Sequence, residues 1–408
     1  MTATVSEIKE PLFNIQTGLQ KSRRHIYLDN NATTQVAKEV KEAMLPYLEA
    51  TYGNPSAIHH IGMSAKEGTD KARRQVARLI NARPNRVIFT GCGSESDNMA
   101  LKGIANSLAG KGRHIITTTI EHPAILKTCA YLEKIGYRIT YLEADEYGII
   151  HPERLKDALT SDTILVSVML ANNEVGTIQP VKELCAISHK QGVLFHTDAV
   201  QAAGKIKIDV EDLDVDMLTL SGHKFHGPKG IGALYIRKGI EIEPLIHGGK
   251  QEKGLRAGTE NVPGIVGMGK AAELAMKMVE QGAKIRRNRE KLENGIRKLI
   301  PEAVLNGHPE QRLPNTLNLT LPGMRGESLV VALDQHGIAL SSGSACKAGS
   351  PDPTHVLLAM GRSDEEAHCS VRFSLSDKIS SRDISETLKA IEQVLKEMKS
   401  TIRFLPCK

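Results

Sequence analysis

Short apolar runs alternate with helical patterns along this chain from residue 26 onward, and this alternation restricts the possible folds more than any other feature. Strands that alternate with helices pair in parallel, and the helices cover both faces of their sheet. The runs predicted as strands of one sheet are residues 87–89, 114–120, 138–142, 163–170, 193–197, 217–220 and 233–236. The sequence therefore predicts an α/β fold with a mostly parallel, seven-stranded sheet.

The pattern changes after a glycine-rich segment at 247–258. A helical pattern over 262–299 follows, and the remaining chain alternates again between strands and helices. Strands are predicted at 316–321, 339–342 and 370–374, and helices at 327–336, 353–360 and 381–401. We therefore predict a large domain over residues 26–262 and a smaller α+β domain made of residues 1–25 and 263–408.

Composition excludes several classes of protein. Lys and Arg exceed Asp and Glu by only 6, and the two signs are interspersed, so no nucleic-acid groove is expected. The aromatic fraction is 3% with no Trp, and no apolar run approaches the roughly 20 residues that span a bilayer. Residues 1–24 lack the apolar core of a secretory signal. We expect a cytoplasmic protein that binds neither nucleic acid nor membrane.

The six cysteines are far apart and form no Cys-x-x-Cys pair. This spacing favours neither a zinc site nor a disulfide framework, so no metal is expected and the thiols should be reduced. Cys129 and Cys185 lie within apolar helical patterns and are predicted to be small core residues.

The sharpest motif is Ser221-Gly222-His223-Lys224, which follows the predicted strand 217–220. A lysine at the mouth of a buried strand can have its pKa lowered and form a Schiff base. A surface lysine in a turn is the alternative. Asp198 ends the preceding strand, where a carboxylate can pair with a protonated ring nitrogen or cap a helix.

Further polar clusters follow other strands of the sheet. Residues 90–98 combine a strand end, small residues and a helix start, which is an anion site suited to phosphate. His122 precedes Pro123 at a helix start, and Asn173 lies in a polar run at 172–174. Because the carboxyl ends of parallel strands meet at one edge of a sheet, these clusters should converge there.

With Tyr27-Leu28-Asp29-Asn30-Asn31-Ala32-Thr33-Thr34 near the start, the set resembles the fold-type I pyridoxal phosphate enzymes of the aminotransferase class V group. Within that group it is similar to the NifS/IscS-type cysteine desulfurases, over about residues 25–400. The resemblance implies a fold-type I transferase fold, with pyridoxal 5'-phosphate as the cofactor.

The resemblance also implies roles for individual residues. Lys224 matches the Schiff-base lysine, Asp198 the partner of the pyridine nitrogen, Gln201 the contact to the ring hydroxyl, and His122 the imidazole stacked on the ring. Asn173 matches an asparagine near the ring hydroxyl and the substrate. The residues that match the phosphate-binding set are Gly93, Ser94, Ser221 and His223, with Ser94 where many members carry Thr. Thr259 matches a threonine that reaches the phosphate of the neighbouring subunit, which implies a homodimer.

Two residues of the second domain complete the predicted site. Glycines and serines surround Cys346, which favours an exposed loop over a buried position, and Lys347 favours its thiolate. Arg372 matches the arginine that binds the substrate carboxylate, with a surface-paired arginine as the alternative. The long loop after Cys346 resembles the group that includes NifS and IscS rather than selenocysteine lyase-like enzymes.

The resemblance implies a cysteine desulfurase that converts L-cysteine into L-alanine and a persulfide on Cys346. The sulfur would pass to an iron–sulfur cluster scaffold or another acceptor protein. The alternatives are another class V enzyme, such as an aminotransferase or a selenocysteine lyase-like enzyme, and a non-catalytic homologue that binds sulfur-transfer partners.

Overall fold

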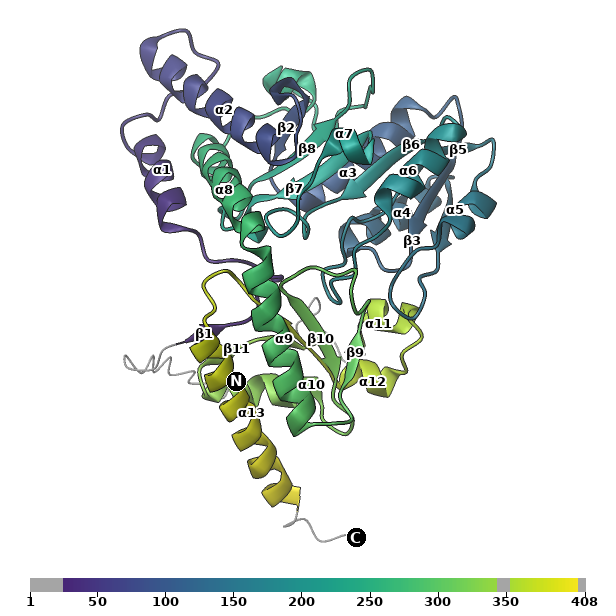
Figure 1. The fold of residues 1–408 in the computed structure, drawn as a ribbon. Coiled ribbons are helices and arrows are strands. Elements are labelled where there is room, and N and C mark those ends of the chain that lie inside the picture. Colours follow the sequence, from purple (N-terminus) through teal and green to yellow (C-terminus); the bar gives the residue numbers. More distant parts are fainter. Residues whose placement is uncertain (1–24, 343–352, 403–408) are drawn as a thin grey trace, which may run out of the picture.

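A computed structural model describes residues 25–342 and 353–402, with side chains described as far as residue 397. These residues form two lobes, each with its own sheet (Figure 1). The larger lobe contains a seven-stranded sheet, and the smaller lobe contains a four-stranded sheet and a two-stranded pair. Among the described helices, none is both long enough and apolar enough to cross a bilayer.

The seven-stranded sheet has the order β2-β8-β7-β6-β5-β3-β4. Only β8 is antiparallel to its neighbours β2 and β7, which confirms the predicted mostly parallel sheet. Each predicted run overlaps one strand. The strands are β2(Val87–Thr90), β3(His114–Thr118), β4(Arg138–Leu142), β5(Thr163–Ser167), β6(Leu194–Asp198), β7(Met217–Ser221) and β8(Gly232–Ile236).

Helices cover both faces of this sheet, which explains why β3, β5 and β7 are buried along their whole length. On one face, α3(Gly93–Ser107) and α4(Pro123–Lys134) pack in a cluster with Ile115 and Leu165. On the other face, the next residues along the same strands, Ile116 and Val166, pack in a second cluster. That cluster draws on α1(Lys38–Leu48), α2(His60–Leu79), α5(Pro152–Ala158), α6(Val181–Lys190), the short α7(Val210–Leu213) and α8(Val262–Glu280).

The helix start predicted at Pro123 is confirmed, and a helix also starts within residues 90–98 as predicted. Pro123 is the first residue of α4, and α6 begins directly after Pro180. The helix that starts within residues 90–98 begins at Gly93, because Cys92 adopts an extended backbone and its thiol accepts a hydrogen bond from Glu95 N.

The smaller lobe contains an antiparallel sheet with the order β12-β13-β10-β9 and a parallel pair of β1 with β11. The predicted strand 339–342 is wrong as a single strand, because β11 pairs with β1 and β12 pairs with β13. The strands are β1(Ile26–Tyr27), β9(Val304–Asn306), β10(Thr316–Thr320), β11(Ile338–Ala339), β12(Ser341–Ser342) and β13(Ser370–Ser374). The helices are α9(Gly282–Leu299), α10(Gly326–Gln335), α11(His355–Ala359), α12(Asp364–His368) and α13(Ser381–Ile402).

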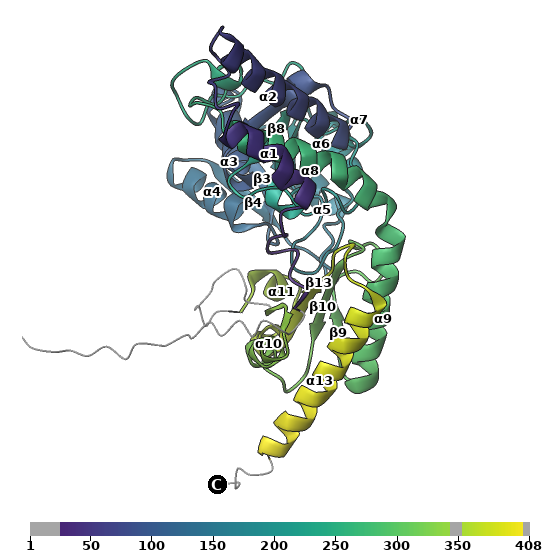
Figure 2. The same cartoon turned by 90° about the vertical axis from the view of Figure 1, so that its left-hand side faces the viewer.

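The helical pattern predicted over 262–299 forms two helices, with Gln281 between α8 and α9. The two helices belong to different cores, since Met268 of α8 packs in the large lobe and Leu292 of α9 packs in the small one. Figure 2 shows α9 descending beside α13 along the lower lobe. Leu28, near the start of the predicted large domain, also packs in the core of the small lobe. The division at residue 262 remains a prediction.

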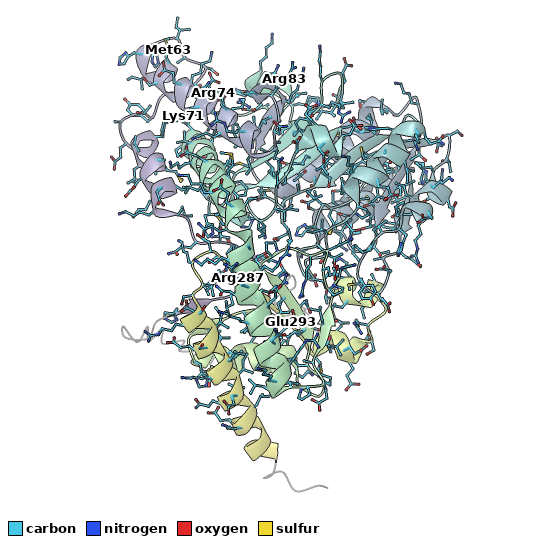
Figure 3. All side chains as sticks on the ribbon, in the orientation of Figure 1. Met63, Lys71, Arg74, Arg83, Arg287 and Glu293 are labelled. Atoms are coloured by element: carbon cyan, nitrogen blue, oxygen red, sulfur yellow. The ribbon has the colours of Figure 1, made fainter. Side chains whose placement is uncertain are left out.

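An ion pair supports the placement of α9. Glu293, labelled on α9 in Figure 3, lies with its Oε2 2.5 Å from Nη2 of Arg312, in the segment that leads into β10. Both side chains are largely buried, so the pair links α9 to the start of the small sheet. That sheet carries the one predicted substrate-binding residue of this lobe that the structure describes, Arg372 of β13.

Candidate active site

A cavity of about 470 Å³ lies at the carboxyl ends of β6 and β7, beside the starts of α3 and α4. This is the edge of a parallel sheet where ligands are expected. Arg372 of β13 reaches the same cavity from the small lobe. The predicted site residues that line it are Gly93, Ser94, His122, Asn173, Asp198, Gln201, Ser221, His223, Lys224 and Arg372.

Lys224 ends the short 3-10 helix η2(Gly222–Lys224), directly after β7. Its Nζ donates to the carbonyl oxygens of Asn31 and Ala32, at 2.8 and 2.7 Å. The N-terminal segment is held to η2 by Thr34, whose N and Oγ1 both donate to His223 O. The amine therefore lies at the wall of the cavity, next to a segment almost two hundred residues earlier in the chain.

Asp198 ends β6, and its Oδ1 accepts a hydrogen bond from Val200 N at 2.8 Å. Burial raises the pKa of this carboxyl to about 6, while the hydrogen bond and the nearby Lys224 act in the opposite direction. A buried carboxylate in a cavity is stabilised by a cationic partner. The side chain faces the cavity that Lys224 also lines, so a protonated ring bound there would meet a carboxylate.

His122 caps the N-terminus of α4 through its side chain, where Nδ1 accepts from Ala124 N at 3.1 Å. Burial lowers the pKa of His122 to about 4, and the charges of Lys224 and His355 lower it further. The ring is therefore neutral at pH 7. Because Nδ1 is an acceptor, the proton of the neutral ring is on Nε2.

The start of α3 lies at the cavity next to the end of β7, an arrangement suited to an anion. Gly93 and Ser94 open this helix, whose first N–H groups have no partner within the helix. A Cβ at Gly93 would lie 3.2 Å from the Cβ of Ser221, so the two elements nearly touch. His223 Nδ1 lies 3.1 Å from Thr33 Oγ1, and burial lowers the pKa of His223 to about 4.

Arg372 is held from both lobes. Its Nη1 donates to Asn173 O at 3.0 Å, and its Nη2 lies 2.8 Å from Asp29 Oδ1. The side chain is 5% exposed, and its Nε has no hydrogen-bond partner within the described residues. The alternative of a surface-paired strand arginine is therefore wrong.

One predicted residue, Thr259, lies apart from this cavity, and another lies outside the described residues. Thr259 lines a second cavity of about 230 Å³, together with Gly91, Arg256 and Glu260. This position is compatible with a contact to another subunit, which remains a prediction. Cys346 lies in segment 343–352, outside the described residues. The predicted core cysteines Cys129 and Cys185 are buried.

Sequence reasoning assigned no role to several residues that the cavity brings together. Asn31 belongs to the segment that carries the resemblance, and its carbonyl accepts from Lys224. Asp97 lies one helical turn after Gly93 on α3, a spacing that places both on one face. Its Oδ1 is buried and has no hydrogen-bond partner among the described residues. Burial and the nearby Asp198 raise the pKa of Asp97 well above its ordinary value.

These features define a pyridoxal phosphate enzyme of the α/β type. A lysine follows β7, a buried carboxylate ends the adjacent strand β6, and the start of α3 is suited to a phosphate. The aminotransferase class-V family matches residues 26–386, and the chain belongs to this family. Family membership implies pyridoxal 5'-phosphate as the cofactor.

Three relatives describe the match more closely. The chain is 50% identical over 382 residues to the cysteine desulfurase IscS of Methanosarcina thermophila, covering 93% of this chain and 94% of the relative. A solved NifS-like protein is 42% identical, with a TM-score of 0.86 over 91% of this chain and all of that one. A solved structure described as SspA in complex with cysteine is 38% identical, with a TM-score of 0.76 over 86% and 99% of the two chains. The predicted membership in the NifS/IscS-type cysteine desulfurases is confirmed.

The residues of the cavity fit pyridoxal phosphate. Asp198 provides a buried carboxylate for a pyridinium nitrogen, and burial raises the pKa of this carboxyl to about 6. The opening of α3 next to Ser221 provides N–H and hydroxyl donors for a phosphate. The cavity volume also lies within the range of small-molecule sites, about 300–1,000 Å³.

Proposed function

We propose that this enzyme binds L-cysteine in the cavity at Lys224 and transfers its sulfur to Cys346, releasing L-alanine. The observation that carries the proposal is the convergence of Lys224, Asp198 and Arg372 on one cavity from three different elements. When bound, pyridoxal phosphate supplies an electron sink for the charge that develops at the substrate Cα. The remaining tasks fall to side chains of this chain.

Arg372 binds the substrate carboxylate. A guanidinium matches a carboxylate with two parallel hydrogen bonds. Asn173 O and Asp29 already orient two of its nitrogens, and Nε has no partner within the described residues. A fork held this rigidly places the Cα of an amino acid toward Lys224.

Lys224 moves the Cα proton. Its Nζ must give up a proton before it can act as a base, and the two carbonyl oxygens of Asn31 and Ala32 can accept from the amine in either state. His122, neutral with its proton on Nε2, adds no positive charge that would oppose protonation of a bound pyridine ring. Asp198 holds the proton of the ring nitrogen in place.

The phosphate is held by Gly93, Ser94, Ser221 and His223. Thr259 of a second subunit completes this set in the proposed homodimer. Support for that arrangement comes from the position of Thr259 in a separate cavity, since it does not line the cavity of its own Lys224. A variant Thr259→Ala should weaken phosphate binding in the dimer.

The sulfur leaves the substrate through Cys346. Its thiolate attacks the sulfur of the bound cysteine, so that an S–S bond forms and the C–S bond breaks. The electron pair of the broken bond stays with carbon, which takes a proton and becomes the methyl group of alanine. The outer sulfur of the persulfide then passes to an acceptor thiol, for which an iron–sulfur cluster scaffold in the cytoplasm is the proposed partner.

Mass spectrometry of the enzyme after one turnover tests this function. We expect the peptide that contains Cys346 to gain the mass of one sulfur atom after incubation with L-cysteine, and to lose it on reduction. Peptides that contain Cys92 or Cys369 serve as internal controls. Alanine release without added sulfur on the Cys346 peptide would contradict the proposal.

A further inference from the structure

Lys205 is a buried lysine behind the cavity, and nothing in the reaction described above uses it. It lies in a turn after β6, and the whole residue is 8% exposed. Its Nζ donates to the backbone oxygen of Gln201 at 2.9 Å and to the side-chain Oε1 of Gln201 at 2.8 Å. Burial lowers the pKa of Lys205 well below its ordinary value, and the charges of Lys224 and Arg372 add to this effect. Burying an amine is costly, and an apolar side chain would fill the same space without that cost.

The other end of the same amide also has a partner. Gln201 Nε2 donates to Asn31 O at 2.9 Å. A carbonyl oxygen can only accept, so the amide nitrogen must lie on that side. The amine of Lys205 has hydrogens to donate whether it is charged or neutral, so the amide oxygen lies on the other side. Two independent partners therefore agree on one orientation of the Gln201 amide.

We propose that Lys205 is a positioning residue that fixes the Gln201 amide so that its N–H groups, and not its oxygen, face the cofactor cavity. Gln201 lines that cavity, whereas Lys205 does not. One hydrogen of Nε2 goes to Asn31 O, and the second is left for the ring hydroxyl of pyridoxal phosphate. A donor at this position selects a ligand with an acceptor oxygen and favours the ionised form of that hydroxyl. This inference rests on the proposed contact between Gln201 and the ring hydroxyl.

The orientation of the Gln201 amide also affects Lys224, because both side chains donate to the same carbonyl oxygen. Asn31 O accepts from Gln201 Nε2 and from Lys224 Nζ, at 2.9 and 2.8 Å. If the Gln201 amide turned over, its oxygen would face the oxygen of Asn31, and the carbonyl that holds Lys224 would meet a repulsive neighbour. Lys205 opposes that rotation, because its amine donates to the amide oxygen on the opposite side.

The test compares the affinity of the apoenzyme for pyridoxal phosphate with its affinity for the 3-deoxy analogue, which lacks the ring hydroxyl. The ratio of the two dissociation constants reports the contact to the hydroxyl and not general damage to the fold. We expect the wild type to prefer pyridoxal phosphate by about tenfold or more, the value of one hydrogen bond to a charged group. Lys205→Met should lower this preference at least threefold, toward the value of Gln201→Ala. In the Gln201→Ala background, Lys205→Met should leave the ratio unchanged.

Gln201→Glu provides a second variant if Lys205→Met fails to fold. Its carboxylate can pair with Lys205 but has no N–H to offer, so the preference for the hydroxyl should disappear. A preference kept by Lys205→Met, or by Gln201→Glu, would overturn the inference while leaving the proposed function intact. If Gln201→Ala also kept the wild-type preference, the proposed contact to the ring hydroxyl would itself be wrong.

Discussion

Nη2 of Arg372 lies 2.8 Å from Oδ1 of Asp29, although the two residues are separated by 343 positions in the sequence. Arg372 belongs to β13 and Asp29 to the N-terminal segment, so this ion pair holds the guanidinium in place at the cavity. Asp29 and Asn173 O together leave the group little freedom to rotate. The arginine is therefore oriented before any substrate binds.

Arg372→Lys should raise the KM for L-cysteine by about tenfold or more, because a lysine cannot make two parallel hydrogen bonds to a carboxylate. Initial rates over a range of L-cysteine concentrations measure this effect. Arg382→Lys is the matched control, since Arg382 is exposed on α13 and pairs only with Glu386 in the described contacts. An unchanged KM in Arg372→Lys would exclude the proposed carboxylate contact.

Asp198→Asn should retain cofactor binding and lower kcat by about 100-fold, because the neutral amide no longer stabilises positive charge on the ring nitrogen. Absorption of the bound cofactor shows whether the site is loaded, and single-turnover rates of alanine formation report the chemistry. Asp212→Asn removes an exposed carboxylate that pairs with Lys182 and should have neither effect. Full activity of Asp198→Asn would contradict the assigned partner of the ring nitrogen.

Glu121 predicts a pH dependence of stability in the enzyme without cofactor. Its Oε1 accepts from Thr118 Oγ1 and Met169 N, both at 2.9 Å, and burial raises the pKa of Glu121 to about 8 from its ordinary 4.5. The folded protein holds this proton more tightly than the unfolded chain, so the contribution of Glu121 is present below pH 4.5 and is lost as the pH rises toward 8.

Glu121→Gln removes the titration and keeps the acceptor oxygen. We expect the variant to gain stability relative to the wild type between pH 5 and pH 8, as measured by urea unfolding at both values. Parallel stability curves for the two proteins would show that Glu121 is ionised in the fold across this range.

Gly232 on β8 lies against the loop that leads into α3. A Cβ at this position would lie 2.5 and 2.6 Å from the backbone C and O of Cys92. Backbone cannot yield as a side-chain tip does, so Gly232→Ala should cost about 1–3 kcal/mol and displace the phosphate-binding residues at Gly93. Gly110→Ala adds the same atom where no heavy atom lies within 4 Å.

Thermal unfolding and the dissociation constant of pyridoxal phosphate measure both effects. Gly110→Ala should match the wild type in each. If Gly232→Ala bound the cofactor as tightly as Gly110→Ala, the close approach of β8 to the loop would have no role in shaping the phosphate site.

The strands of the large sheet were predictable because most of them are buried on both faces and are rich in apolar and β-branched residues. The elements of the small lobe were harder to predict from the sequence. β9 has three residues, too few to show a period, and the break at Gln281 has no proline to mark it. In the sequence, β11 and β12 form one continuous run. They are separate strands only because they pair with different partners, β1 and β13.

The site residues were predictable where they lie close to the end of a strand or the start of a helix. Asp198 ends β6, Lys224 follows β7 in η2, and His122 caps α4. The residues that support them carry no such local mark. Asp29 acts on Arg372 only through tertiary folding. Lys205 stands four residues after Gln201 in a run of small residues, and only its burial distinguishes it from a surface lysine.

Cys346 is the proposed route by which sulfur leaves L-cysteine. The most direct measurement is alanine production from L-cysteine and a reductant, by the wild type and by Cys346→Ala, each loaded with pyridoxal phosphate. We predict that the wild type forms alanine, while the variant retains the absorption of the bound cofactor and does not turn over. Equal alanine production by both proteins would contradict the claim, because the sulfur would then leave by a route that does not involve Cys346.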